Sequence, residues 1–115
     1  MAFNIEDIGE IDQVVGQWCL NRIPPHLKKS VDYDYEIDGQ AVIIIEVRPA
    51  WRGSPGEFTR QPMAKLRFVK ATEQWQIYWM RASGKWKSYD PMFEATELDD
   101  ALMVIESDHY GCFFG

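Results

Sequence analysis

Side chains suited to binding an anion are concentrated in the middle of the chain. Five arginines and four of the five tryptophans lie between Arg48 and Ser88. A guanidinium group binds phosphate or carboxylate through two parallel hydrogen bonds, and tryptophan and tyrosine stack on planar groups. The sequence therefore predicts a site for an anionic or planar ligand, with nucleic acid as one candidate partner. The predicted ligand-binding residues are Arg48, Trp51, Arg52, Arg60, Arg67, Tyr78 and Trp86.

The charge distribution allows two interpretations of these residues. The segment from Arg48 to Ser88 has nine basic and two acidic side chains, a net charge of +7 in a chain of formal net charge −6. An acidic chain is unsuited to coating nucleic acid over its whole surface, but it can present a local basic patch. Alternatively, the arginines pair across strands with the acidic segment Asp32 to Asp38, and Trp75 and Trp79 belong to the core. The sequence leaves both interpretations open.

A catalytic use of the same region is the alternative function. Glu57 lies among arginines, and as a general base it could serve a small hydrolytic or nucleolytic enzyme together with Arg52 and Arg60. Neighbouring arginines would lower the pKa of Glu57 and keep it ionised, which suits the buried half of a salt bridge better than a proton shuttle. We therefore favour a non-enzymatic binding module and expect Glu57 to pair with an arginine of its own loop or of the following strand.

Signatures of metal or cofactor binding are missing from the sequence. The spacings of Cys19, His26, His109 and Cys112 match no zinc motif. No glycine-rich phosphate loop or nucleophile elbow is present either. We therefore expect neither a metal nor a cofactor.

The length and composition are those of one globular domain. The 115 residues are 46% hydrophobic and 26% charged, and no apolar run is long enough to span a membrane. The acidic N-terminal segment does not resemble a secretory signal, and two dispersed cysteines cannot build a disulfide framework. We expect a single domain over residues 1–115, in the cytoplasm, with reduced thiols and no membrane partner. The oligomeric state is left open.

The elements that must position the site begin with a helix predicted over residues 4–22. Asn4 is the expected N-cap with Asp7 three residues later, and Pro24 and Pro25 stop the helix. Apolar residues recur at steps of three or four and predict one buried stripe. Its members are Ile5, Ile8, Ile11, Val15 and Trp18.

A hairpin is predicted next. Residues 31–37 alternate between apolar and acidic side chains, and residues 41–47 are apolar on both faces, which is typical of a central strand. A two-residue turn at Asp38-Gly39 would place Glu46 on the tyrosine face. A three-residue loop would instead pair Tyr35 with Ile43 and Tyr33 with Ile45, which keeps that face apolar. We expect the three-residue loop.

The remaining chain predicts a meander and a second helix. A long loop over residues 48–62 leads to strands over residues 63–69, 75–80 and 85–89, joined by short turns. Thr96 and Asp99 resemble a capping box before a helix whose apolar side includes Leu98 and Ile105, and the apolar tail after Gly111 is expected to pack on the sheet. The predicted fold is α+β: an N-terminal helix, a five-stranded antiparallel sheet, and a C-terminal helix, with the helices on one sheet face.

One motif also carries a resemblance. It consists of Arg48-Pro49, Trp51-Arg52, Gly56-Glu57-Phe58-Thr59-Arg60, Pro62, Ala64, Leu66-Arg67-Phe68, Trp75, Tyr78-Trp79 and Gly84-Lys85-Trp86 with Tyr89. In this motif, and more weakly around Arg22-Ile23-Pro24 and over residues 111–115, the chain resembles a family of small bacterial proteins catalogued as a domain of unknown function. The resemblance implies a shared fold and a bacterial source, and it brings no activity or ligand. Phe58 and Phe114 depart from it, since tryptophan is expected there in many members.

Overall fold

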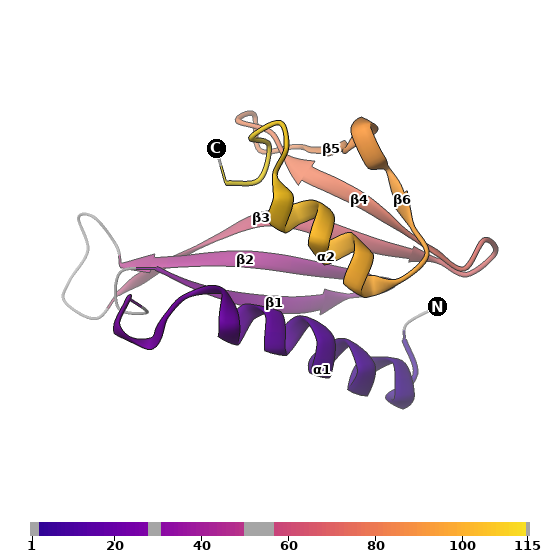
Figure 1. The fold of residues 1–115 in the computed structure, drawn as a ribbon, viewed down its shortest axis with the longest axis horizontal. Coiled ribbons are helices and arrows are strands. Elements are labelled where there is room, and N and C mark those ends of the chain that lie inside the picture. The colour runs from indigo at the N-terminus through magenta and orange to yellow at the C-terminus, as the bar shows by residue number, and fades with distance from the viewer. Residues whose placement is uncertain (1–2, 28–30, 50–56, 115) are drawn as a thin grey trace.

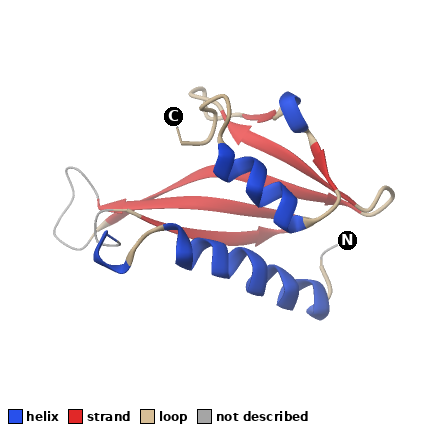
Figure 2. Cartoon of the chain, in the orientation of Figure 1, coloured by secondary structure: helices blue, strands red, loops and turns tan. Residues whose placement is uncertain are grey.

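The chain folds into an antiparallel sheet with two helices against it (Figures 1 and 2). The computed structural model describes residues 3–27, 31–49 and 57–114. The predicted α+β fold is confirmed, and Glu94 and Ala95 add a sixth short strand. The α-helices and strands are α1 (Ile5–Arg22), β1 (Asp32–Asp38), β2 (Ala41–Pro49), β3 (Phe58–Val69), β4 (Gln74–Met80), β5 (Trp86–Ser88), β6 (Glu94–Ala95) and α2 (Leu98–Ser107), and short 3₁₀-helices cover Pro25–Leu27 and Asp90–Met92.

The strands lie in the order β1-β2-β3-β4-β5, and β6 pairs with Trp75 and Gln76, near the start of β4. Every pairing is antiparallel, as sequential strands with short connections predict. Neither helix among the described residues is long and apolar enough to cross a membrane.

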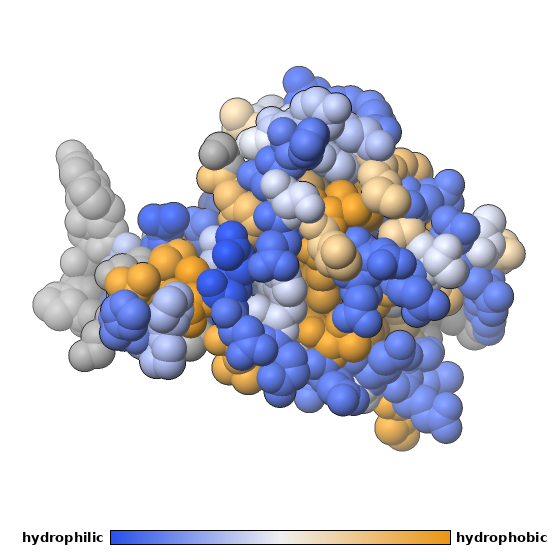
Figure 3. Space-filling model, in the orientation of Figure 1, coloured by the Kyte–Doolittle hydropathy of each residue, from blue (hydrophilic) through white to orange (hydrophobic). Residues whose placement is uncertain are grey.

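One face of the sheet, here called the covered face, carries the core. Both helices lie on it, and their polar outer sides flank apolar surface that shows between them (Figures 1 and 3). The sheet contributes Val42, Ile44, Leu66 and Ile77, and all four are completely buried. Ile11, Val15 and Ile105 of the helices pack against them in the same cluster. The opposite face, here called the open face, has no helix over it in the described part of the chain.

The register of the first hairpin differs from the prediction. Asp38 pairs with Ala41, so the turn has two residues, and Tyr35 faces Ile44 instead of Ile43. Because β2 is apolar on both faces, either register buries branched side chains, and turn chemistry decides between them. Gly39 adopts a φ of 59°, as a two-residue hairpin turn requires. Glu46 therefore does lie on the tyrosine face.

The first helix confirms its cap but not its whole stripe. Asp7 donates its backbone N–H to the Asn4 side chain at 2.8 Å and accepts from the Asn4 backbone at 3.2 Å, a complete capping box. Ile5 is 89% exposed and Ile8 is 42% exposed, so the predicted stripe is wrong at this end. Phe3, which precedes the helix, packs there instead, with its ring stacked on Trp75 at 5.8 Å.

The second helix begins one residue later than predicted. Its N-cap is Glu97, whose side chain makes no capping hydrogen bond, so the predicted box at Thr96 and Asp99 is wrong. Leu98 and Ile105 are buried as expected.

The predicted central loop is shorter than expected because β2 and β3 continue into it. Arg48 pairs with Thr59 and Val47 with Arg60, so the loop is reduced to the residues between Pro49 and Phe58. Residues 50–56 lie outside the described part of the chain. A β-bulge follows in β3: Ile44 faces Ala64 while Ile45 faces Pro62, leaving Met63 as the extra residue.

A candidate ligand-binding groove

The register divides the predicted binding residues between the two sheet faces. Residues paired across antiparallel strands share a face, so Arg60, Arg67, Tyr78 and Trp86 lie on the open face and Arg48 lies on the covered face. Trp51 and Arg52 lie outside the described residues. The predicted set therefore does not form one surface in the described part of the chain.

Arg60 pairs across strands with the acidic segment, as the alternative interpretation of the arginines predicts. Its Nη2 atom lies 3.0 Å from Asp34 Oδ2 and 3.3 Å from Glu36 Oε1, both on the acidic strand β1. The hydrogen bond to Asp34 is the main reason that the pKa of Arg60 is raised. The pairs are solvent-exposed, so their contribution to stability is small, but they occupy this guanidinium.

The other open-face residues are partly engaged. Tyr78 donates its hydroxyl to Gln76 at 3.0 Å, and its ring meets Phe93 edge-on at 5.4 Å. Lys65 Nζ lies 5.8 Å from the centre of the Tyr78 ring. Arg67 is exposed and has no ion pair with another described residue, and Trp86 is half-buried. These residues offer a cation and aromatic edges on the open face.

Arg48 is the predicted residue that lines a concave site. Its Nε atom donates to Glu46 Oε1 at 2.6 Å, and this hydrogen bond is the main reason that its pKa is raised. The Tyr33 hydroxyl donates to the other Glu46 oxygen at 3.4 Å. Burial is the main cause of the raised pKa of Tyr33, so this phenol stays protonated as a donor. Glu46 thus holds Arg48 through Nε. The terminal nitrogens of the same guanidinium remain to donate hydrogen bonds to the oxygens of a ligand.

Arg48 and Arg81 line a groove of about 500 Å³ at one end of the sheet. Gln61 is a further polar member, while methionine and phenylalanine side chains supply apolar surface. Arg81 belongs to the +7 segment but is not among the predicted ligand-binding residues. The lining residues are Glu46, Arg48, Gln61, Pro62, Met63, Met80, Arg81, Ala82, Gly84, Gly111, Cys112, Phe113 and Phe114.

The C-terminal tail forms one wall of this groove and is held by Asp108. The carboxylate accepts the backbone N–H of Phe113 at 2.9 Å and that of Phe114 at 2.8 Å. Phe113 is buried beside Tyr89, with ring centres 5.0 Å apart, and the Phe114 ring meets Tyr33 of β1 edge-on at 6.0 Å, so the predicted packing of the tail on the sheet is confirmed. Arg22 Cζ lies 4.4 Å from the centre of the Phe114 ring.

Cys112 also lies in this wall, and the groups around it do not activate its thiol as a nucleophile. Burial raises the pKa of the Cys112 thiol, and the charge of Asp108 raises it further. Since the thiolate is the reactive form, this cysteine is poorly suited to covalent chemistry near neutral pH.

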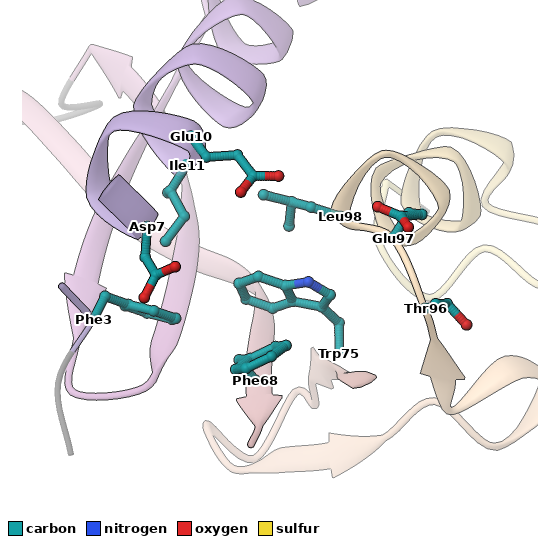
Figure 4. Close-up of a pocket in the computed structure, with 9 residues that line it drawn as sticks. All are labelled: Phe3, Asp7, Glu10, Ile11, Phe68, Trp75, Thr96, Glu97 and Leu98. Carbon is teal, nitrogen blue, oxygen red and sulfur yellow. The ribbon is translucent and has the colours of Figure 1, made fainter. Parts of the chain in front are cut away.

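A second cavity of about 170 Å³ has the opposite charge (Figure 4). Phe3 and Trp75 form its aromatic part, and Asp7, Glu10 and Glu97 line it with carboxylates from both helix starts. Three carboxylates repel an anion, so this cavity does not fit the predicted ligand class.

The catalytic alternative gains no support from the described residues. Glu57 is exposed and has no ion pair there, so the prediction that it forms the buried half of a salt bridge is wrong for Arg60. Its pairing with Arg52 lies outside the described residues. No group of three or more His, Cys, Asp or Glu residues in the described ranges is placed to hold a metal ion.

Comparison with known proteins supports the resemblance. Residues 3–115 match the model of one family, whose description is Domain of unknown function (DUF3024). No curated protein and no solved structure matches the chain.

Proposed function

We propose, for a chain that belongs to this family, that the domain is a non-enzymatic binding module for a small anionic ligand with a planar or apolar part. The observation that carries the proposal is the pair Arg48 and Arg81 on a groove of about 500 Å³. Ligand pockets in proteins commonly have volumes of about 300–1,000 Å³, with mostly apolar walls and a few polar groups that fix orientation.

Charge favours an anion in this groove. Glu46 is the acidic residue in the lining, and its two oxygens are already engaged by Arg48 and the Tyr33 hydroxyl. Arg81 is exposed and has no ion pair with another described residue, so its guanidinium can receive a phosphate or carboxylate. Gln61 adds a neutral donor and acceptor.

The apolar wall favours a ligand that is more than a simple ion. Met63 and Phe113 offer buried carbon surface beside the cations, and the Phe114 ring lies next to them. A planar ring in the ligand would contact this wall while its acidic group meets the arginines. Trp51 and Arg52 follow Arg48 closely in the chain and remain predicted members of the site.

Titration with defined probes tests the proposal. Inorganic phosphate, benzoate and adenosine monophosphate are titrated by calorimetry into the parent chain and into Arg48→Gln and Arg81→Gln. Lys70→Gln is the control, since it removes one exposed positive charge that does not line the groove. We expect adenosine monophosphate or benzoate to bind more tightly than phosphate, and each arginine variant to lose about tenfold in affinity, or about 1.4 kcal/mol.

Two results would contradict this function. One is the absence of binding by all three probes at low salt. The other is an equal loss in Lys70→Gln and in the arginine variants, which would reflect net charge alone. A single-stranded RNA that binds with steep salt dependence, and that needs Arg67 rather than Arg48, would move the site to the open face.

A further inference from the structure

Strand β2 is apolar on both faces, although the helices cover one. On the covered face it contributes Val42 and Ile44 to the core. On the open face Ile43 and Val47 are half-buried, whereas Ala41 (4% exposed) and Ile45 (3% exposed) are already covered within the single chain. The solvent face of an antiparallel sheet is ordinarily polar, so this apolar strip along β2, of which Ile43 and Val47 stay partly exposed, favours a surface that another molecule covers.

The charges beside this strip follow a regular pattern. In each row across the open face an acidic residue of β1 and a residue of β3 flank an apolar residue of β2. Three of the four β3 residues are basic. The rows are Asp32–Val47–Arg60, Asp34–Ile45–Pro62, Glu36–Ile43–Lys65 and Asp38–Ala41–Arg67.

We propose that the open face binds the open face of a second copy, around a two-fold axis that runs parallel to β2. Rotation about this axis keeps each row at its own level and exchanges its two ends. The β1 acids of one copy then lie over the β3 residues of the other, which are basic in three of the four rows. Asp38 meets the Arg67 of the other copy, Glu36 meets its Lys65, and the β2 strips face each other.

Charge selects this axis over the other in-plane axis. A two-fold axis perpendicular to the strands would stack β1 on β1 and β3 on β3, which opposes like charges. The chosen arrangement also has the usual anatomy of an interface, an apolar centre with a charged rim. Arg67 and Lys65 have no ion pair within the described part of their own chain, whereas Arg60 bridges Asp34 and Glu36.

The overlap is small, which sets the expected strength. The nine residues of β2 span about 30 Å, and three strands span about 14 Å. The footprint is therefore about 420 Å² per copy, below the size of stable specific interfaces, so we expect a weak, transient dimer that forms with increasing concentration and dissociates in high salt.

Sedimentation of the full chain tests the proposal. The parent should change from 13.4 kDa towards twice that mass between roughly 5 and 500 µM. Asp38→Lys and Arg67→Glu should each weaken the dimer by about tenfold or more, because each opposes like charges twice in the dimer. An equimolar mixture of these two variants should associate again, and so should the chain carrying both changes.

The control is Glu106→Lys, an equal charge change at an exposed position of α2, which should leave the dimer unchanged. A parent that stays monomeric over the whole range overturns the proposal, as does a complex larger than a dimer. So does a mixture of Asp38→Lys and Arg67→Glu that fails to associate. The groove takes no residue from these rows except Pro62, so a failure here is distinguishable from failure of the proposed binding function.

Discussion

Asp108 should control both the stability of the domain and the shape of the groove. Its carboxylate accepts two backbone hydrogen bonds from the tail, at 2.9 Å from Phe113 and 2.8 Å from Phe114. It also ends α2 in the left-handed region, at a φ of 41°. Asparagine tolerates this backbone but offers one carbonyl oxygen in place of two charged ones.

The loss of unfolding free energy can be worked out for Asp108→Asn and Asp108→Ala. Hydrogen bonds to charged groups are worth about 1.5–3 kcal/mol each, and half-burial of Asp108 places them at the lower end. Asp108→Asn, which loses one bond, should cost about 1–2 kcal/mol of unfolding free energy. Asp108→Ala loses both and adds about 1–2 kcal/mol of backbone strain, so about 4 kcal/mol is expected.

Urea unfolding followed by tryptophan fluorescence measures these losses, and hydrogen exchange at the Phe113 and Phe114 amides localises them. Ser107→Ala is the neighbouring control, since Ser107 makes one exposed hydrogen bond to Met103 and should change stability by less than about 0.5 kcal/mol. If Asp108→Asn equals Ser107→Ala in stability and leaves both amides as protected as in the parent, Asp108 does not hold the tail.

Three further predictions concern the sheet. Burial, followed by the hydrogen bond to Asp12, raises the pKa of Tyr35 from 10.0 to about 12. The folded state therefore favours the protonated phenol, and this stabilisation, complete below pH 10, should be lost as the pH rises to about 12. The urea midpoint of Tyr35→Phe should fall less between pH 10 and pH 12 than that of the parent. An equal fall in the two chains would refute the raised pKa of Tyr35. Ile44→Ala should cost about 2–5 kcal/mol at concentrations that keep the chain monomeric, and more than Ile43→Ala, whereas the reverse order would favour the three-residue loop. Gly39→Ala should cost about 1–2 kcal/mol through its φ of 59°, with Gly39→Asn closer to the parent in thermal melts, and equal melting of all three would exclude strain at this turn.

Periodicity predicted which elements form but could not fix how they meet. The helix cap at Asn4 and the existence of the strands could be predicted because each depends on residues close together in the sequence. The hairpin register was not, because β2 can bury either of its faces and the choice falls to the turn at Gly39. The strand ends were also predicted wrongly: Pro49 and Pro62 suggest a loop, yet Pro49 ends β2 and Pro62 lies in β3 next to the bulge.

The candidate site was harder to predict because it depends on long-range geometry. Arg60 and Asp34 are far apart in the chain, and their pairing follows from the alignment of three strands. The contact of Arg48 with Glu46 could have been predicted from the sequence, since residues two apart on a strand share a face. Arg81 reaches the groove through the placement of β4 beside the tail, for which the sequence has no local signal.

The bulge at Met63 has a consequence for insertions and deletions. Ala64 and Pro62 keep their partners on β2 even though one residue stands between them. Odd-numbered residues of β3 therefore face the helices before the bulge, and even-numbered residues face them after it. A chain shorter by this one residue would keep Arg60 and Arg67 on their present side, because the two halves of the strand would simply join in phase. Strands ordinarily resist a change of length by one residue, but β3 can absorb one at Met63, at the cost of the contacts of a buried methionine.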